Sequence, residues 1–149
     1  MKLIIRKAEL KDINQMCGLL YQLFSIEEDF VFDEKKQSAG LEMMINNKDS
    51  VVLVACDGER VIGMVTMQKL ISTAQGAEVG LIEDMIVTEE YRGMSSGSEL
   101  LKSICRIAEG NGLKRIQLLA DKNNISAKIF YKKNKWSETS LECMRYCCD

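Results

Sequence analysis

The spacing of hydrophobic and polar positions along this chain changes several times, and each change marks an expected element. Residues 3–6 read Leu-Ile-Ile-Arg and predict a short strand, and apolar residues at three- and four-residue spacing then predict a helix that opens at residues 12–17. The apolar side of this helix is formed by Leu10, Ile13, Met16, Cys17, Leu20 and Leu23. A polar patch over residues 27–37 separates it from a second helix, whose apolar side carries Leu41, Met44 and Ile45.

The middle of the chain has the pattern of strands. Residues 51–56 and 61–67 are apolar and rich in valine, and the Asp57-Gly58 pair between them predicts a tight β-hairpin. Another strand is expected at residues 79–87. It is followed by a glycine-bearing turn and an amphipathic helix from residue 98 to about residue 109, which ends at the Asn111-Gly112 capping signal.

The last third of the chain predicts a strand at residues 116–120, a helix at residues 124–133, and one or two final strands between residues 136 and 147. The element order is therefore β-α-α-β-β-β-α-β-α-β-β. This order predicts an α/β fold, with helices on the faces of one mixed sheet. No linker or internal repeat divides the chain, so a single domain over residues 1–149 is expected.

Composition narrows the class of protein. With 149 residues, of which 46% are hydrophobic, the chain can bury one core. Its apolar runs are far shorter than the roughly 18 residues of a membrane helix, and no signal-peptide region follows the charged start, so we expect a cytoplasmic protein without a membrane partner. The cysteines form no Cys-x-x-Cys pair, which favours reduced thiols over a disulfide framework or a metal site. These cysteines are Cys17, Cys56, Cys105, Cys143, Cys147 and Cys148.

The chain contains no histidine, and this restricts its chemistry. A Ser-His or Cys-His catalytic pair cannot be built, so any proton transfer falls to Glu, Asp, Tyr, Lys or Cys. The formal net charge of −2, with no stripe of basic residues, argues against nucleic acid as a partner.

The glycine-bearing turn is the first candidate for a binding site. It lacks the Gly-x-x-x-x-Gly-Lys-Ser/Thr pattern of a P-loop and the Gly-x-Gly-x-x-Gly fingerprint of dinucleotide-binding folds. The backbone N–H groups of residues 93–98 nevertheless converge at the start of a helix, with Arg92 beside them, an arrangement that favours a diphosphate. On these residues alone, a capped helix with a surface arginine is an equally good interpretation.

Two sequence blocks decide between these interpretations. Residues 82–101, with Tyr-Arg-Gly-Met-Ser-Ser-Gly-Ser at their centre, resemble the acyl-coenzyme A pyrophosphate motif of the GNAT superfamily of N-acetyltransferases. Residues 124–136 are similar to that family's Asn-x-x-Ala-x-x-Phe-Tyr-x-Lys-x-Gly-Phe block. The two blocks occur in the family's order, and with residues 3–12 and Gly63 the resemblance covers essentially the whole chain. It implies a mixed, mostly antiparallel sheet flanked by helices.

The resemblance also implies roles for individual residues. Acetyl-coenzyme A would be the acyl donor, and Glu83 would act as general base, through water, while Tyr131 would donate to the departing thiolate. Asp84 is the weaker candidate base, because in a regular strand it faces away from Glu83. The expected donor-binding residues are Met85, Ile86, Val87, Arg92, Gly93, Met94, Ser95, Ser96, Gly97, Ser98, Asn124 and Lys133. Direct attack in a ternary complex is preferred to a cysteine acyl-enzyme, because no histidine can activate a thiol.

The acceptor is less well defined by the sequence. Glu27, Glu28 and Asp29 lie between the first two expected helices, a segment that borders the acceptor site in this family, and their charge would attract a small cationic amine. A protein lysine or N-terminus remains an alternative acceptor, and a solvated acidic face remains the alternative for the segment. A non-catalytic acyl-coenzyme A-binding module remains the alternative to an enzyme. The resemblance also implies a homodimer, and the cysteine spacing predicts no metal.

The chain departs from the family pattern at two positions. Ser95 stands where the first loop glycine is usual, and Lys135 stands where glycine usually precedes the aromatic residue. If Ser95 adopts a positive φ, the backbone strain is on the order of 1 kcal/mol. If its φ is helical, serine supplies an additional hydroxyl.

Overall fold

A computed structural model of the chain describes residues 1–27 and 29–148, which fall into two compact units. The first unit spans residues 1–118 and the second spans residues 119–149. The single domain expected over residues 1–149 therefore stays a prediction.

The first unit contains all of the sheet and three of the four α-helices. Its elements are β1 Leu3–Lys7, α1 Ile13–Ile26, α2 Glu34–Asn46, β2 Ser50–Asp57, β3 Arg60–Ser72, β4 Ala77–Val87, α3 Ser96–Gly110 and β5 Ile116–Leu118. Two short 3₁₀ turns, η1 Leu10–Asp12 and η2 Glu89–Tyr91, precede α1 and follow β4. The second unit contains α4 Ile125–Lys133.

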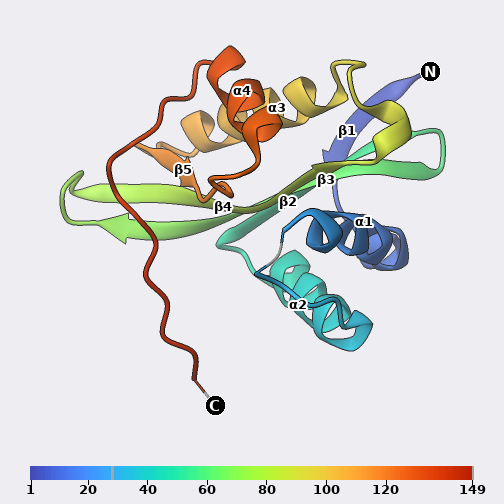
Figure 1. Cartoon of the computed structure of the whole chain (residues 1–149), viewed down its shortest axis with the longest axis horizontal. Coiled ribbons are helices and arrows are strands. Elements are labelled where there is room, and N and C mark those ends of the chain that lie inside the picture. The colour runs from blue at the N-terminus through green and yellow to red at the C-terminus, as the bar shows by residue number, and fades with distance from the viewer. Residues whose placement is uncertain (28, 149) are drawn as a thin grey trace. The chain divides into compact units, whose positions relative to one another are not determined.

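The sheet has the strand order β1-β2-β3-β4-β5. The strands β1 to β4 are antiparallel to one another, and β5 pairs with β4 in parallel. Within the first unit, α1 and α2 cover one face of the sheet and α3 covers the other (Figure 1). The predicted mixed, mostly antiparallel sheet flanked by helices is confirmed.

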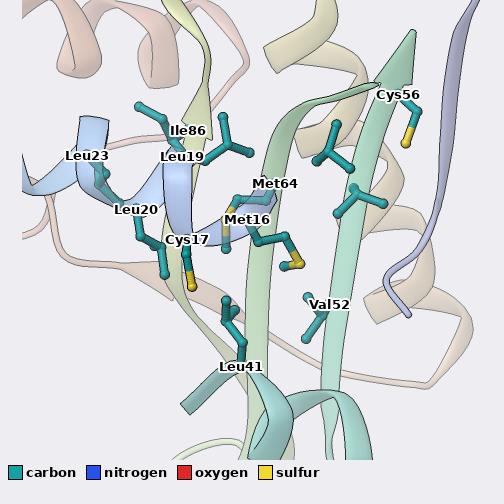
Figure 2. Packing of buried hydrophobic residues seen from close by; sticks show 12 residues of the cluster. Met16, Cys17, Leu19, Leu20, Leu23, Leu41, Val52, Cys56, Met64 and Ile86 are labelled. Carbon is teal, nitrogen blue, oxygen red and sulfur yellow. The ribbon is translucent and has the colours of Figure 1, made fainter. Parts of the chain in front are cut away.

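The face under α1 and α2 holds one part of the core. Met16 and Leu20 of α1 pack with Leu41 of α2 against β2 and β3, where Met64 is fully buried. Figure 2 shows Met16 beside Met64 and Leu19 beside Ile86. The four-residue spacing of apolar positions in α1 is what brings Met16 and Leu20 to one face of the helix.

The opposite face is closed by α3, whose Leu100, Leu101 and Ile104 are almost completely buried. This helix approaches the sheet most closely at Gly63, where an added Cβ would lie 3.0 Å from Cδ1 of Leu100 and 3.1 Å from the carbonyl oxygen of Ile86. Glycine at position 63 therefore allows α3, the helix that follows the glycine-bearing turn, to pack directly on β3 and β4.

Several boundaries differ from the sequence-based expectation, and β3 runs to Ser72, well beyond its expected end at residue 67. The α3 helix begins at Ser96, two residues before the expected start, because the carbonyl of Ser95 already accepts the N–H of Glu99 at 3.0 Å. β5 ends at Leu118, two residues before the expected end. The prediction of one or two strands between residues 136 and 147 is wrong, since no strand follows β5 in the described chain. A strand requires a neighbouring strand for its backbone hydrogen bonds, and this tail has none.

None of the described helices has the length and apolar character needed to cross a lipid bilayer. Over residues 1–27 and 29–148, no group of three or more Cys, Asp or Glu side chains is arranged to hold a metal ion.

Candidate active site

The outer edge of β4 is open along its second half. β5 pairs with β4 only from Gly80 to Ile82. The N–H of Thr88 points to β3, where it donates to Ile62 at 2.8 Å, so by strand alternation the backbone groups of Met85 and Val87 point to the opposite, open edge. In the described first unit these groups have no strand partner, and apart from the Val87 carbonyl, which accepts from Arg92, they can form hydrogen bonds to a ligand that lies along β4.

A β-bulge interrupts β4 where the catalytic carboxylate was expected. Val65 pairs with Met85 and Met67 pairs with Ile82, so Glu83 and Asp84 together oppose the single residue Thr66. A bulge interrupts the strict alternation of side chains, so the expected opposite orientation of Asp84 stays a prediction. The bulge places two adjacent carboxyl groups at one point of the sheet.

The two carboxyl groups have different environments. Glu83 is exposed, whereas Asp84 is half-buried. The Oγ1 hydroxyl of Thr66 donates to Oδ2 of Asp84 at 3.0 Å and accepts the Asp84 N–H at 3.0 Å. Burial raises the pKa of Asp84 to about 6, opposed by the hydrogen bond from Thr66 and reinforced by the nearby Glu83 charge. No local sequence signal identifies Thr66, because it meets Asp84 only across the bulge.

The raised pKa of Asp84 predicts a pH-dependent stability. The folded protein binds this proton more tightly than the unfolded chain, whose Asp pKa is near 3.8, so the free energy of unfolding should fall as pH rises from about 4 to about 6. Asp84→Asn removes the titration and keeps an oxygen acceptor for Thr66. At pH 8 this variant is expected to be more stable than wild type by about 1–3 kcal/mol.

Urea unfolding at several pH values measures this effect. The two proteins should converge towards about pH 3, where Asp84 is neutral in both the folded and the unfolded state. Glu78→Gln, an exposed acid on the same strand, is the matched control and should leave the pH profile of wild type unchanged. A constant difference between Asp84→Asn and wild type from pH 4 to pH 8 would contradict the assignment.

The glycine-bearing turn leads directly into α3 and leaves that helix uncapped. Gly93 and Ser95 have φ of 77° and 68°, and such left-handed residues turn successive N–H groups towards a common point, as in anion-binding concavities. Ser95 occupies the N-cap position without a side-chain capping hydrogen bond. The N–H groups of Ser96, Gly97 and Ser98 are the first-turn donors that a helix leaves without intrahelical partners.

A buried hydroxyl lies at the same helix end. Ser96 is only 1% exposed, and its Oγ has no hydrogen-bond partner among the described residues. Unpartnered buried polar atoms are rare, because each loses its hydrogen bonds to water without replacement. Together with the three free N–H groups and the positive end of the helix dipole, this hydroxyl makes the start of α3 suited to an anion.

Arg92 is held beside this helix end. Its Nε donates to the carbonyl oxygen of Val87 at 2.9 Å. The side chain is exposed and forms no ion pair with a described residue, so its terminal nitrogens remain available to an anion. In the first unit, the turn that begins at Arg92 therefore lies next to the end of β4.

The short segment before Arg92 is fixed by the β2–β3 turn. Arg60 makes two hydrogen bonds of 3.0 Å to the carboxylate of Glu90, and its guanidinium lies 5.4 Å from the ring centre of Tyr91. The Tyr91 hydroxyl donates to Oδ2 of Asp57 at 3.0 Å. Sequence reasoning missed this support, because the hydrogen-bonded pairs are separated by 30 and 34 residues in the chain and carry no shared motif.

A second support comes from α1. Gln22 exchanges hydrogen bonds with the buried Thr88, from Nε2 to Oγ1 at 3.1 Å and from Oγ1 to Oε1 at 3.2 Å. Thr88 is the residue directly after β4. The helix that precedes the acidic segment is therefore tied to the strand end that precedes the glycine-bearing turn.

Both departures from the family glycines have the same structural consequence. Ser95 and Lys135 are the positive-φ residues other than glycine in the described chain, with φ of 68° and 70°. Lys135 ends α4: its N–H bonds to Lys132 at 3.0 Å and the next N–H, of Trp136, bonds to Tyr131 at 2.9 Å, the pattern of a Schellman cap. Each L-residue in this conformation carries strain on the order of 1 kcal/mol.

Ser95→Gly and Lys135→Gly are each expected to raise the free energy of unfolding by about 0.5–1 kcal/mol, after the greater freedom of glycine in the unfolded chain is subtracted. Ser98→Gly, in the regular first turn of α3, is the matched control and should destabilise by a similar amount. Urea denaturation measures all three. Ser95→Gly should also leave donor affinity unchanged or improved, because glycine lets the backbone approach a phosphate more closely. Destabilisation by Ser95→Gly would contradict the strain at this position.

The second unit carries the other expected donor-side residues. Asn124 caps α4 and accepts the N–H of Ala127 at 3.1 Å, which explains asparagine at the helix start. The Tyr131 ring contacts Phe130 and Trp136, with centroids 5.2 and 5.9 Å away. Lys133 is exposed in the last turn of the helix. The roles of Asn124, Tyr131 and Lys133 towards the donor stay predictions.

The segment between α1 and α2 combines acidic and aromatic side chains. Glu27 caps the end of α1 and Asp29 follows it, while Glu28 lies outside the described residues. Sequence reasoning did not use the aromatic residues here: Phe24 and Phe30 have ring centres 5.3 Å apart, and Tyr21 and Phe32 meet edge to face at 5.2 Å. These two ring pairs give the segment an apolar side next to its charges.

Comparison with known proteins identifies the family of this chain. The model of the acetyltransferase (GNAT) family matches residues 18–136. A Bacillus subtilis protein named as an uncharacterized N-acetyltransferase is 25% identical over 134 residues, which cover 90% of this chain and 89% of that protein.

Two solved structures share the fold over nearly the whole chain. One, described as a "possible acetyltransferase" from Clostridium difficile, has a TM-score of 0.87 and 19% identity, covering 100% of this chain and 99% of its own. An aminoglycoside acetyltransferase from an uncultured soil metagenomic sample has a TM-score of 0.82 and 20% identity, covering 99% and 97%.

The chain belongs to the acetyltransferase (GNAT) family. It is accordingly an acyltransferase, and the resemblance inferred from its two sequence blocks is confirmed.

Proposed function

We propose that this acyltransferase moves an acetyl group from acetyl-coenzyme A to a primary amine, favouring a small cationic amine. The observation that carries the proposal is the uncapped start of α3, with the buried Ser96 hydroxyl and Arg92 beside it, next to the open edge of β4. The free N–H groups and Arg92 suit a diphosphate, and the open backbone groups of β4 suit an amide-bearing arm. Acetyl-coenzyme A contains both chemical groups.

The chemistry is assigned to two carboxyl groups of β4 and, from the family resemblance, to Tyr131 of the second unit. The amine attacks the thioester carbonyl carbon as a free base, the C–S bond breaks, and the thiolate leaves. We assign the amine proton to Glu83, acting through water, which its exposed position permits. Asp84 is the second candidate base. Its pKa of about 6 lies closer to neutral pH, where a general base is most effective. The Tyr131 phenol is proposed to hydrogen-bond the thiolate.

The acceptor is proposed to bind near the segment that contains Glu27 and Asp29. Carboxylates attract a cationic amine, and the exposed face of Tyr21 adds a cation–π surface. One solved structure with the same fold is described as an aminoglycoside acetyltransferase, and aminoglycosides are cationic amines, in keeping with this class of acceptor. A protein lysine or N-terminus is the alternative acceptor. A homodimer and a cytoplasmic location complete the proposal, and light scattering tests the dimer.

Mass spectrometry of the reaction products is the appropriate test of acetyl transfer. The exposed thiols of Cys143, Cys147 and Cys148 would react with the reagents that detect released coenzyme A. The protein should therefore be incubated with acetyl-coenzyme A and a panel of amines: a polyamine, an aminoglycoside, an arylalkylamine and a lysine peptide. We expect an acetylated product from at least one cationic small amine. Donor binding without acetylation of any amine would favour the non-catalytic binding module.

A further inference from the structure

A cavity of about 410 Å³ lies at the far end of α3 from the glycine-bearing turn. It is lined by residues from the end of β1, the C-terminal ends of α2 and α3, the start of β2, and β3. α3 has 15 residues and rises about 1.5 Å per residue, so its two ends are roughly 20 Å apart. This cavity is therefore separate from the proposed donor site.

The lining of this cavity is basic. Lys7, Lys48 and Lys69 contribute to it, and no lining residue is acidic, although the chain as a whole has a net charge of −2. None of the three lysines forms an ion pair with a described residue. Asp49, the nearest acid in sequence, is exposed and is not among the lining residues.

The partial negative charges at the two helix ends do not neutralise the three lysines. The C-terminal ends of α2 and α3 each carry a partial charge of about −0.5, which sums to roughly one negative charge against three ammonium groups. Lys48 lies just after α2, but Lys7 and Lys69 come from strands. The cavity therefore keeps a net positive potential.

A polar group without a partner also lines the cavity. The Oγ of Ser50 is buried and has no hydrogen-bond partner among the described residues. The exposed side-chain amides of Asn46 and Asn111 line the cavity as well. An oxygen-rich anion would satisfy the Ser50 hydroxyl, which otherwise loses its hydrogen bonding to water. Ile45 and Ile107 give the cavity an apolar wall.

We propose that this cavity is a binding site for a small phosphorylated molecule. A phosphoryl group carries a charge of about −1.5 to −2 at pH 7 and several acceptor oxygens, which match three lysines and the unpartnered Ser50 hydroxyl. The cavity volume lies in the range of small-ligand sites, roughly 300–1,000 Å³. Val52, which lines the cavity, pairs with Thr66 of β3. Thr66 forms the hydrogen bond to Asp84, so one residue connects the lining of the cavity to the bulge.

The test is an amide NMR titration of the full chain with inorganic phosphate at low ionic strength, with acetate as the monoanion comparison. Phosphate is expected to shift the amides of Ser50, Val51 and Lys69 in a saturable manner, at least 10-fold more tightly than acetate. Lys48→Gln with Lys69→Gln should weaken phosphate binding at these amides by 10-fold or more. The same spectra report whether each variant is folded.

The matched control removes two charges from the other end of α2. Lys35→Gln with Lys36→Gln should bind phosphate within about two-fold of wild type, since neither lysine lines the cavity. Several outcomes would overturn the proposal: shifts that do not saturate, binding that survives loss of Lys48 and Lys69, equal losses in the control, or shifts confined to residues 93–98. The last outcome would mean that phosphate occupies only the proposed donor site.

Discussion

Glutamine in place of Glu83 is expected to slow acetyl transfer by roughly 10²-fold, the usual contribution of a positioned proton-transfer group. Glutamine keeps the volume and the bulge but cannot accept the amine proton. The loss should be largest at low pH, where free amine is scarce, and should shrink as pH approaches the pKa of the amine. Steady-state rates across pH with a confirmed acceptor measure the effect, and kcat should fall while donor affinity stays within a few fold.

Three further variants test which groups take part in proton transfer. Glu78→Gln, an exposed acid on the same strand, should retain wild-type rates. Tyr131→Phe keeps the ring and its contacts with Phe130 and Trp136 but removes the phenol, so turnover should also fall with little change in donor affinity. Wild-type rates in Glu83→Gln together with a large loss in Asp84→Asn would move the base to Asp84. Wild-type rates in all of these variants would remove the bulge carboxyls and Tyr131 from the mechanism.

Arg92→Ala combined with Gly97→Asp is expected to weaken acetyl-coenzyme A binding by at least 10-fold, or about 1.4 kcal/mol. The first change removes a cation, and the second places a carboxylate where the phosphates are proposed to lie. The fold should survive, because an acidic residue in the first turn of a helix is favourable to the helix dipole. Calorimetry with acetyl-coenzyme A measures the loss.

Arg106→Ala provides the control, since Arg106 is an exposed arginine in the second half of the same helix. Its donor affinity should match wild type. Unchanged affinity in the double variant would remove the assignment of residues 92–98 to the pyrophosphate.

Elements with local signals were predicted well from the sequence. The β2–β3 hairpin follows from two apolar runs around Asp57-Gly58, and Gly58 has the positive φ of 59° that this turn requires. α3 follows from its spacing of apolar residues and the Asn111-Gly112 cap, where Gly112 has φ of 75°. In these segments, periodicity and turn chemistry depend only on neighbouring residues.

Features that depend on distant residues were missed. The tail between residues 136 and 147 was expected to form one or two strands, but Leu141, Met144 and Tyr146 in it are exposed and its backbone has no partner strand in the described chain. The bulge at Glu83 and Asp84 depends on the register of β3 against β4, which no local pattern encodes. The environment of Asp84 therefore emerged only from the structure.

Amide NMR of the full chain with added acetyl-coenzyme A tests most directly whether the start of α3 holds the donor. The N–H groups of Ser96, Gly97 and Ser98 have no intrahelical partners, so hydrogen bonds to the pyrophosphate should shift their amide signals strongly and saturably. The open-edge residues Met85 and Val87 should shift with them. Saturable binding that leaves these five signals in place and shifts residues elsewhere would contradict the proposed donor site.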